Sequence, residues 1–233
     1  MTEAEWLATA DPDIIHRPLP PLDYQQMLKY VADRYVALRK RRLGDRKLRL
    51  FACECCRQHW ELLSHEGQAA VIQAEEFAEG RLSRRELAAV RRAANAAGLG
   101  VNGYHRDYPA RVVMEPVALS AAYHTANARL NLDHQRPLFP HESWGYHFEL
   151  AALIRDIFGN PFRPVAFDPR WRTETAVALA TGVYADRAFD RLPVLADALE
   201  EAGCDHPDVL AHCRGPGPHV RGCWVVDLVL GNG

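Results

Sequence analysis

The sequence of 233 residues contains no apolar run that approaches the roughly 20 residues needed to span a bilayer. Its first residues, MTEAEWLATADPD, are acidic and carry neither the basic start nor the apolar stretch of a signal peptide. We therefore expect a cytoplasmic protein without a membrane partner. In that compartment the six cysteines are expected to be reduced thiols and not a disulfide framework.

A strong charge of either sign is also missing. Lys and Arg together number 28 and Asp and Glu 30, which gives a formal net charge of −2. Long-range attraction to nucleic acid is therefore not expected. The hydrophobic share of 48% is ordinary for a globular protein, and a chain of this length has enough apolar residues for one large core or two small ones.

The alternating pattern of half-buried β-strands is scarce, whereas apolar residues recur at helical spacing through most of the chain. We therefore predict an all-α fold, an irregular multi-helix bundle of about eight to ten helices. The expected helices cover 2–8, 23–43, 45–63, 66–79, 83–97, 116–130, 144–158 and 192–202, with further helices after Thr173 and from Pro207. Residues 98–113 show no clear period and are expected to form a loop.

Several helix ends are also predicted by single residues. Thr2 and Ser83, each followed by Glu three residues later, are expected to cap their helices with a capping box, and Thr173 is expected to cap the helix that follows it. Gly203 is expected to end the helix 192–202 in a left-handed conformation.

The segment CWVVDLVL, residues 223–230, is the one element with two interpretations. Its β-branched residues would suit a short C-terminal strand. A single strand with no partner strand would leave its backbone N–H and C=O groups unpaired, so a short buried helix is the preferred prediction.

The sequence GNPFRP, residues 159–164, predicts a rigid turn, because each proline fixes its own φ and restricts the residue before it. We expect two parts on either side of this turn. Residues 1–158 form an N-terminal helical region with a variable, histidine-rich segment at about 100–145. Residues 159–233 form a C-terminal helical module whose end is rich in Cys and His.

The cysteines of the C-terminal module have two interpretations. In the first they are core residues, because Cys213 follows Val209 at helical spacing and a free cysteine behaves as a small hydrophobe. His212 then lies on the opposite, solvent-facing side of the same helix, paired with Asp208.

The second interpretation is a structural zinc site with the ligands Cys204, Cys213, His219 and Cys223, or with His212 in place of Cys213. Of these, only His219 and Cys223 have the short spacing typical of zinc ligands, and no C-x-x-C pair occurs in the chain. The default expectation is therefore that no cofactor is bound, with zinc as the alternative.

Two groups of cations could bind a protein partner. The first is the run Arg39, Lys40, Arg41 and Arg42, placed at the end of the predicted helix 23–43. The second is Arg214 and Arg221, which flank the stiff Gly-Pro-Gly-Pro sequence. We expect this loop at the surface, with Arg214, His219 and Arg221 presented to an anionic group.

The middle of the chain is rich in imidazole, with His105, His124, His134, His141 and His147 near Glu142 and Glu149. Such residues can hold a catalytic metal. No H-E-x-x-H arrangement is present, however, to place two ligands and a base on one helical face.

Three stretches of the chain resemble a family of paralogous planctomycete proteins of the Gemmata type. They are MTEAEWL at the start, DRKLRLFACECCR in the second long helix, and HCRGPGPHVRGCWVVDLVLG at the end, preceded by RDIFGNPFRPV and DRAFDRLPVLADALEEAGC. The resemblance covers about the first ninety and the last eighty residues. It implies a bacterial, cytoplasmic origin and a shared module, and it implies no catalytic residues.

Because no convergent catalytic set is present, we expect a non-enzymatic interaction or regulatory module with an unidentified protein partner. The first alternative is a small zinc-binding protein with a structural site near the C-terminus. The second alternative is a metal-dependent hydrolase that uses the central histidines.

Overall fold

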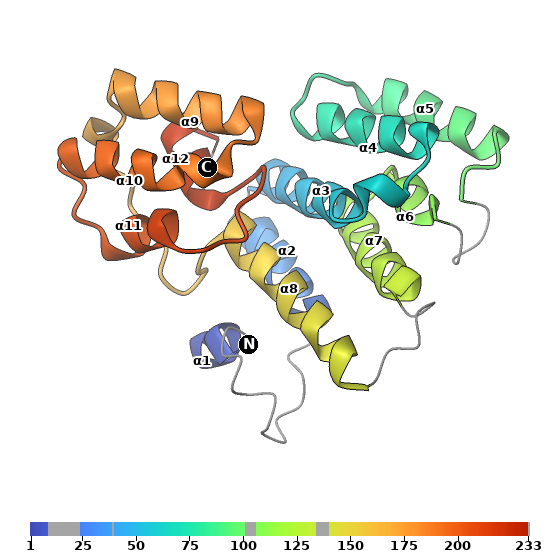
Figure 1. The fold of residues 1–233 in the computed structure, drawn as a ribbon, viewed down its shortest axis with the longest axis horizontal. Coiled ribbons are helices and arrows are strands. Elements are labelled where there is room, and N and C mark those ends of the chain that lie inside the picture. The colour runs from blue at the N-terminus through green and yellow to red at the C-terminus, as the bar shows by residue number, and fades with distance from the viewer. Residues whose placement is uncertain (9–23, 39, 101–105, 134–139, 233) are drawn as a thin grey trace. The chain divides into compact units, whose positions relative to one another are not determined.

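The computed structural model describes residues 1–8, 24–38, 40–100, 106–133 and 140–232. Within these ranges the chain forms twelve α-helices, three short 3₁₀ helices (Trp60–Leu62, Pro169–Trp171 and Phe189–Arg191) and no strand (Figure 1). The prediction of an all-α, multi-helix fold is confirmed. None of the described helices combines the length and the apolar character that crossing a membrane requires.

The chain divides into two compact units, Met1–Ile154 and Arg155–Gly233. The division falls within α8 (Pro140–Phe158), shortly before the predicted turn at 159–164.

The first unit is organised around α3 (Arg41–Arg57), which contacts α2 (Tyr24–Ala37), α4 (His65–Ala78) and α7 (Ala118–Asp133) (Figure 1). The sequence of α3 has an apolar face wide enough to be covered by neighbouring helices on more than one side. The buried residues on α3 include Leu48, Leu50, Phe51, Ala52, Cys53, Cys55 and Cys56. The wide apolar face of α3 is therefore buried. The other helices of this unit are α1 (Glu3–Ala8), α5 (Arg84–Ala96) and α6 (Tyr108–Val112), together with α8 up to Ile154.

Two predicted helix starts are confirmed by their capping boxes. Thr2 Oγ1 accepts from the backbone N–H of Glu5, and the Glu5 carboxylate accepts from the N–H of Thr2. Ser83 and Glu86 make the same reciprocal pair at the start of α5. Each pair satisfies backbone donors that a helix leaves without partners in its first turn.

The boundary between α2 and α3 differs from the prediction. The first long helix was expected to continue to residue 43, but α2 ends at Ala37 and α3 begins at Arg41. Gly44 therefore lies inside α3, where an added Cβ would come within 2.7 Å of the Tyr35 Cβ. The glycine permits a close approach of two helices and does not end one. As a result, Lys40, Arg41 and Arg42 of the basic run lie at the start of α3 and not at the end of α2.

The predicted loop 98–113 is wrong in part, because Tyr108–Val112 forms the short helix α6. Pro109 lies in its first turn, a position where proline is well tolerated because its missing N–H has no helical partner there. A helix of five residues is too short to show a hydrophobic period, which explains why the pattern did not reveal it.

The second unit contains the last turn of α8 together with α9 (Glu174–Asp186), α10 (Leu192–Glu201), α11 (Pro207–Arg214) and α12 (Trp224–Leu230). Helix α10 packs on α9 and α11, and α12 packs on α9. The buried core of this unit includes Val183, Leu195, Leu199, Val209, Val226 and Val229.

Two predictions about this unit are confirmed. Gly203 ends α10 with a φ of 87°, and the N–H of Cys204 then donates to the carbonyl of Leu199 over 2.9 Å, as expected for a left-handed cap. The segment 223–230 forms the short helix α12 with Val225, Val226 and Val229 buried, so the alternative of a C-terminal strand is wrong.

Candidate metal centre

Four side chains with metal-binding groups meet inside the second unit. Asp156 lies in the last turn of α8, His212 on α11, His219 in the loop that follows, and Cys223 directly before α12. One ligand atom from each side chain lies within 4.8 Å of the other three. The side chains of Asp156, His219 and His212 are 2%, 10% and 18% exposed, and Cys223 is fully buried. The group could hold a metal ion.

Three of the six separations between the four ligand atoms are close to those around a tetrahedral ion, and all six are within 4.8 Å. His212 Nε2 lies 3.1 Å from Cys223 Sγ and 3.1 Å from Asp156 Oδ1, and His219 Nδ1 lies 2.9 Å from the same Oδ1. Ligands placed about 2.0–2.3 Å from zinc at tetrahedral angles are separated by about 3.3–3.6 Å. These three distances are within about half an ångström of the tetrahedral values.

His219 and Asp156 each make a backbone contact through the side-chain atom that faces away from the centre of the site. His219 Nε2 lies 3.2 Å from the carbonyl oxygen of Gly215, to which an N–H at that position donates. Asp156 Oδ2 accepts from the backbone N–H of Val220 over 3.0 Å. These contacts turn His219 Nδ1 and Asp156 Oδ1 toward the centre of the group. Metal-binding histidines and carboxylates are commonly oriented by outer hydrogen bonds of this kind.

Aromatic packing fixes the remaining histidine. The His212 ring contacts the His219 ring, with centroids 4.8 Å apart, and the Trp224 ring, with centroids 5.1 Å apart. Trp224 in turn packs against Gly159, whose φ of 67° ends α8 and where a Cβ would come within 3.1 Å of the indole Cγ. The glycine after α8 thus lets the indole approach, and the indole supports His212.

Burial and the neighbouring charges shift the pKa in opposite directions at Asp156 and His219, and in the same direction at Cys223. Burial raises the pKa of the Asp156 carboxyl, but hydrogen bonds from His212 and His219 outweigh it and hold this pKa below its usual value. Burial lowers the pKa of His219, and the hydrogen bond and charge of Asp156 raise it to a net value above the usual one. Burial, together with the charge of Asp156, raises the pKa of the Cys223 thiol well above its usual value. A divalent cation would therefore displace a proton from Cys223 on binding.

The group differs in two members from the set predicted by spacing. His219 and Cys223 belong to it, and so does His212, which was weighed as a replacement for Cys213. Cys204 and Cys213 lie in the apolar core, 2% and 0% exposed, and burial raises the pKa of Cys213 to about 12. The expected surface pair of His212 with Asp208 is replaced by the inward contact of His212 with Asp156.

Asp156 is the residue that sequence reasoning missed, although two signals pointed to it. It stands in the last turn of a helix, where the helix dipole disfavours a negative charge. It also stands between Leu153 and Ile157 on an apolar stripe, both of them buried. A carboxylate in such a position requires partners.

The loop at 215–218 is exposed as predicted at Pro216, Gly217 and Pro218, but His219 is turned inward and not presented to solvent. The predicted partner-binding residues Arg214 and Arg221 both have contacts within the unit. Arg214 pairs with Asp197 and Glu200 at 2.8 and 2.6 Å, and these hydrogen bonds raise its pKa. Arg221 donates to the carbonyls of Tyr184 and Ala185.

The basic run of the first unit is described only in part. Lys40 and Arg42 are exposed. Arg39 and the side chain of Arg41 lie outside the described residues.

Most of the central histidines also lie outside the part of the chain whose side chains are described, namely His105, His134, His141 and His147, together with Glu142. His124 is exposed, and its Nδ1 lies 2.8 Å from Glu115 Oε1. Glu149 is exposed. The prediction of a hydrolytic site here stays a prediction.

No family model, curated protein or solved structure matches this chain.

Proposed function

We propose that the C-terminal unit is a zinc-binding module, in which Asp156, His212, His219 and Cys223 hold one ion that stabilises the fold. The observation that carries this proposal is the convergence of four ligand atoms within 4.8 Å in a buried position. The backbone contacts of Gly215 and Val220, which orient His219 and Asp156, support it further.

The ligand chemistry favours zinc over other common ions. Calcium and magnesium take oxygen ligands almost exclusively, whereas this group offers one carboxylate, two imidazoles and one thiolate. Zinc binds all three ligand types in tetrahedral geometry. Its two positive charges would also neutralise the Asp156 carboxylate and a Cys223 thiolate, the two anions of the group.

A structural role is favoured over a catalytic one. Four protein ligands complete a tetrahedron, whereas catalytic zinc sites keep a position open for water or substrate. The ligands come from the end of α8, from α11, from the loop after it and from the residue before α12, so one ion would link four segments. Binding free energy at such a site becomes folding free energy.

A structural zinc site is compatible with the non-enzymatic interaction or regulatory module expected from the sequence. Under this proposal the ion shapes the C-terminal unit, and recognition of a protein partner occurs elsewhere on the molecule. No catalytic step is assigned to the site.

The test is the metal content of protein purified without added metal. We expect about one zinc per chain by mass spectrometry of the metal. Asp156→Asn and Cys223→Ala should each lose it. Cys213→Ala is the matched control, because it removes a buried sulfur from the same unit without removing a ligand. A wild-type protein that contains no metal and takes up none from buffered zinc refutes the proposal.

A further inference from the structure

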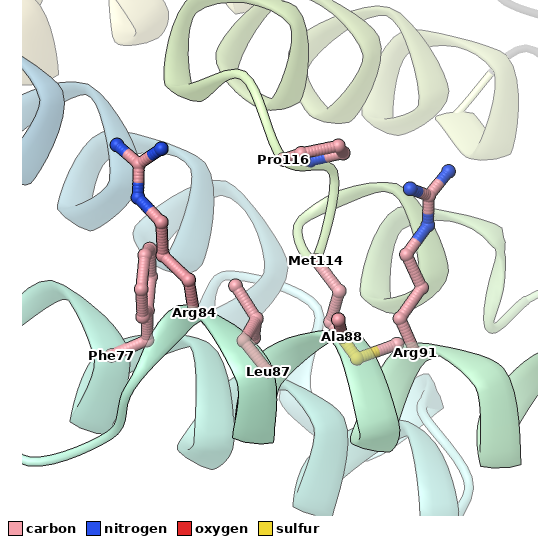
Figure 2. A pocket seen from close by; sticks show the side chains of 7 residues that line it. All are labelled: Phe77, Arg84, Leu87, Ala88, Arg91, Met114 and Pro116. Atoms are coloured by element: carbon pink, nitrogen blue, oxygen red, sulfur yellow. The ribbon is translucent and has the colours of Figure 1, made fainter.

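The first unit contains a small cavity between α4, α5 and the segment before α7 (Figure 2). Its volume is about 90 Å³, and its apolar lining includes Phe77, Leu87, Ala88 and Met114. Leu87 and Met114 belong to the buried core of the unit, while Ala88 is exposed at the rim. The cavity is thus a shallow opening onto core side chains.

Two arginines of α5, Arg84 and Arg91, also line this cavity. A separation of seven residues places them on one side of the helix, about 10 Å apart along its axis. Figure 2 shows both side chains extending in the same direction, with Leu87 and Ala88 between them. The apolar opening is therefore flanked by two guanidinium groups.

Neither guanidinium makes a hydrogen bond or an ion pair with any residue that the structure describes. The one acidic residue of α5 is Glu86, and its carboxylate accepts from the backbone N–H of Ser83 over 2.8 Å in the capping box. Nothing on the helix itself neutralises the two cations.

We propose that this cavity is a docking site for an acidic protein segment, which inserts one apolar side chain and places a carboxylate on each of Arg84 and Arg91. An apolar floor between two guanidinium groups complements an apolar anchor between two carboxylates, since guanidinium binds carboxylate in a planar, bidentate geometry. This inference does not rest on the metal centre, because the cavity lies in the other unit.

The size and chemistry of the opening select this occupant. Small-molecule sites enclose roughly 300–1,000 Å³ and bury most of the ligand. A cavity of about 90 Å³ has room for a single side chain. A nucleic acid would contact all the arginines of α5 through its phosphates and would make no specific use of the apolar floor.

The test uses a fluorescein-labelled helical peptide in which one leucine is flanked by a glutamate about one turn away on each side. Fluorescence anisotropy should show saturable binding to the wild-type protein that weakens as salt is added. Arg84→Gln/Arg91→Gln, which keeps the long side chains but removes both charges, should weaken binding about tenfold. Ala88→Phe, which fills the opening from its exposed rim, should weaken it by a similar factor.

The matched control is Arg85→Gln/Arg92→Gln. These two arginines are exposed on the same helix with the same spacing, and they do not line the cavity. This variant should bind the peptide within about twofold of the wild type. Unchanged melting temperatures in all three variants would establish that the fold is intact.

Three results would overturn the proposal. The first is the absence of saturable binding of the peptide to the wild-type protein. The second is an equal loss in the two double variants, which would indicate general attraction to a cationic helix. The third is a single-stranded oligonucleotide that binds more tightly than the peptide and is weakened equally by both double variants. That result would indicate that α5 binds nucleic acid.

Discussion

Replacing Cys223 by serine tests whether this residue is a zinc ligand or only a core cysteine, because the two roles predict different responses of the stability to a chelator. Cys223 is fully buried, so a serine hydroxyl there lacks a full set of hydrogen-bond partners and costs about 1–3 kcal/mol in either role. Cys213→Ser carries the same cost, since Cys213 is equally buried. Only the Cys223 variant should also lose the stabilisation that the metal supplies.

The metal contribution follows from mass action. At a free zinc concentration about 1,000 times the dissociation constant, binding to the folded state alone stabilises it by about 4 kcal/mol. For a unit of this size that corresponds to a change in melting temperature on the order of 20 °C. Cys223→Ser should therefore cost about 5–7 kcal/mol in buffered zinc, against about 1–3 kcal/mol for Cys213→Ser.

The assay is guanidinium unfolding with and without chelator, in a reductant that contains no thiol. The chelator should lower the unfolding free energy of the wild type and of Cys213→Ser by about 4 kcal/mol each, and should leave Cys223→Ser nearly unchanged. If the wild type unfolds identically with and without chelator, the reasoning is wrong. The four groups would then be a buried hydrogen-bond network that needs no ion.

Gly44→Ala should destabilise the first unit by about 1–3 kcal/mol in denaturant unfolding, because its Cβ would come within 2.7 Å of the Tyr35 Cβ. Gly182→Ala on α9, which has open space around it, should instead stabilise by about 0.4–1 kcal/mol, and equal effects would contradict the close packing. Burial raises the pKa of Cys213 from 9.0 to about 12, so the folded state favours the neutral thiol. The stability that the neutral thiol contributes is complete below pH 9 and is lost as the pH rises toward 12. The stability advantage of the wild type over Cys213→Ala should accordingly shrink between pH 9 and 12, and a constant difference would refute the shift. Ser83→Ala should cost about 1 kcal/mol through loss of the capping box on α5, measured as a shift of the denaturant midpoint.

Local patterns were sufficient for most of the helices. Thr2, Ser83 and Thr173 each accept a backbone N–H at the start of the helix they were predicted to cap. The position of Gly203 likewise predicted the end of α10. Such signals lie within a few residues of the helix end that they specify, so they can be identified from a single sequence.

The parts that were not predicted depend on residues distant in sequence. Gly44 resembles a helix break until Tyr35 is known to pack against it. The helical period of α11 correctly separated the faces of Cys213 and His212. It could not show that the face of His212 meets the end of α8, so that face was assigned to solvent. Asp156 stands far from the Cys/His-rich end of the chain, and only the fold brings it there.

The distribution of sulfur has a practical consequence. All six cysteines are buried, with Cys53, Cys55 and Cys56 on α3 of the first unit and Cys204, Cys213 and Cys223 in the second. A thiol-directed reagent can therefore react only after local or global opening exposes a sulfur, and the rate of labelling measures the free energy of that opening. Peptide mapping of the labelled protein would assign each event to one triplet. The native chain thus carries two sets of reporters, one for the opening of each unit, without any engineered label.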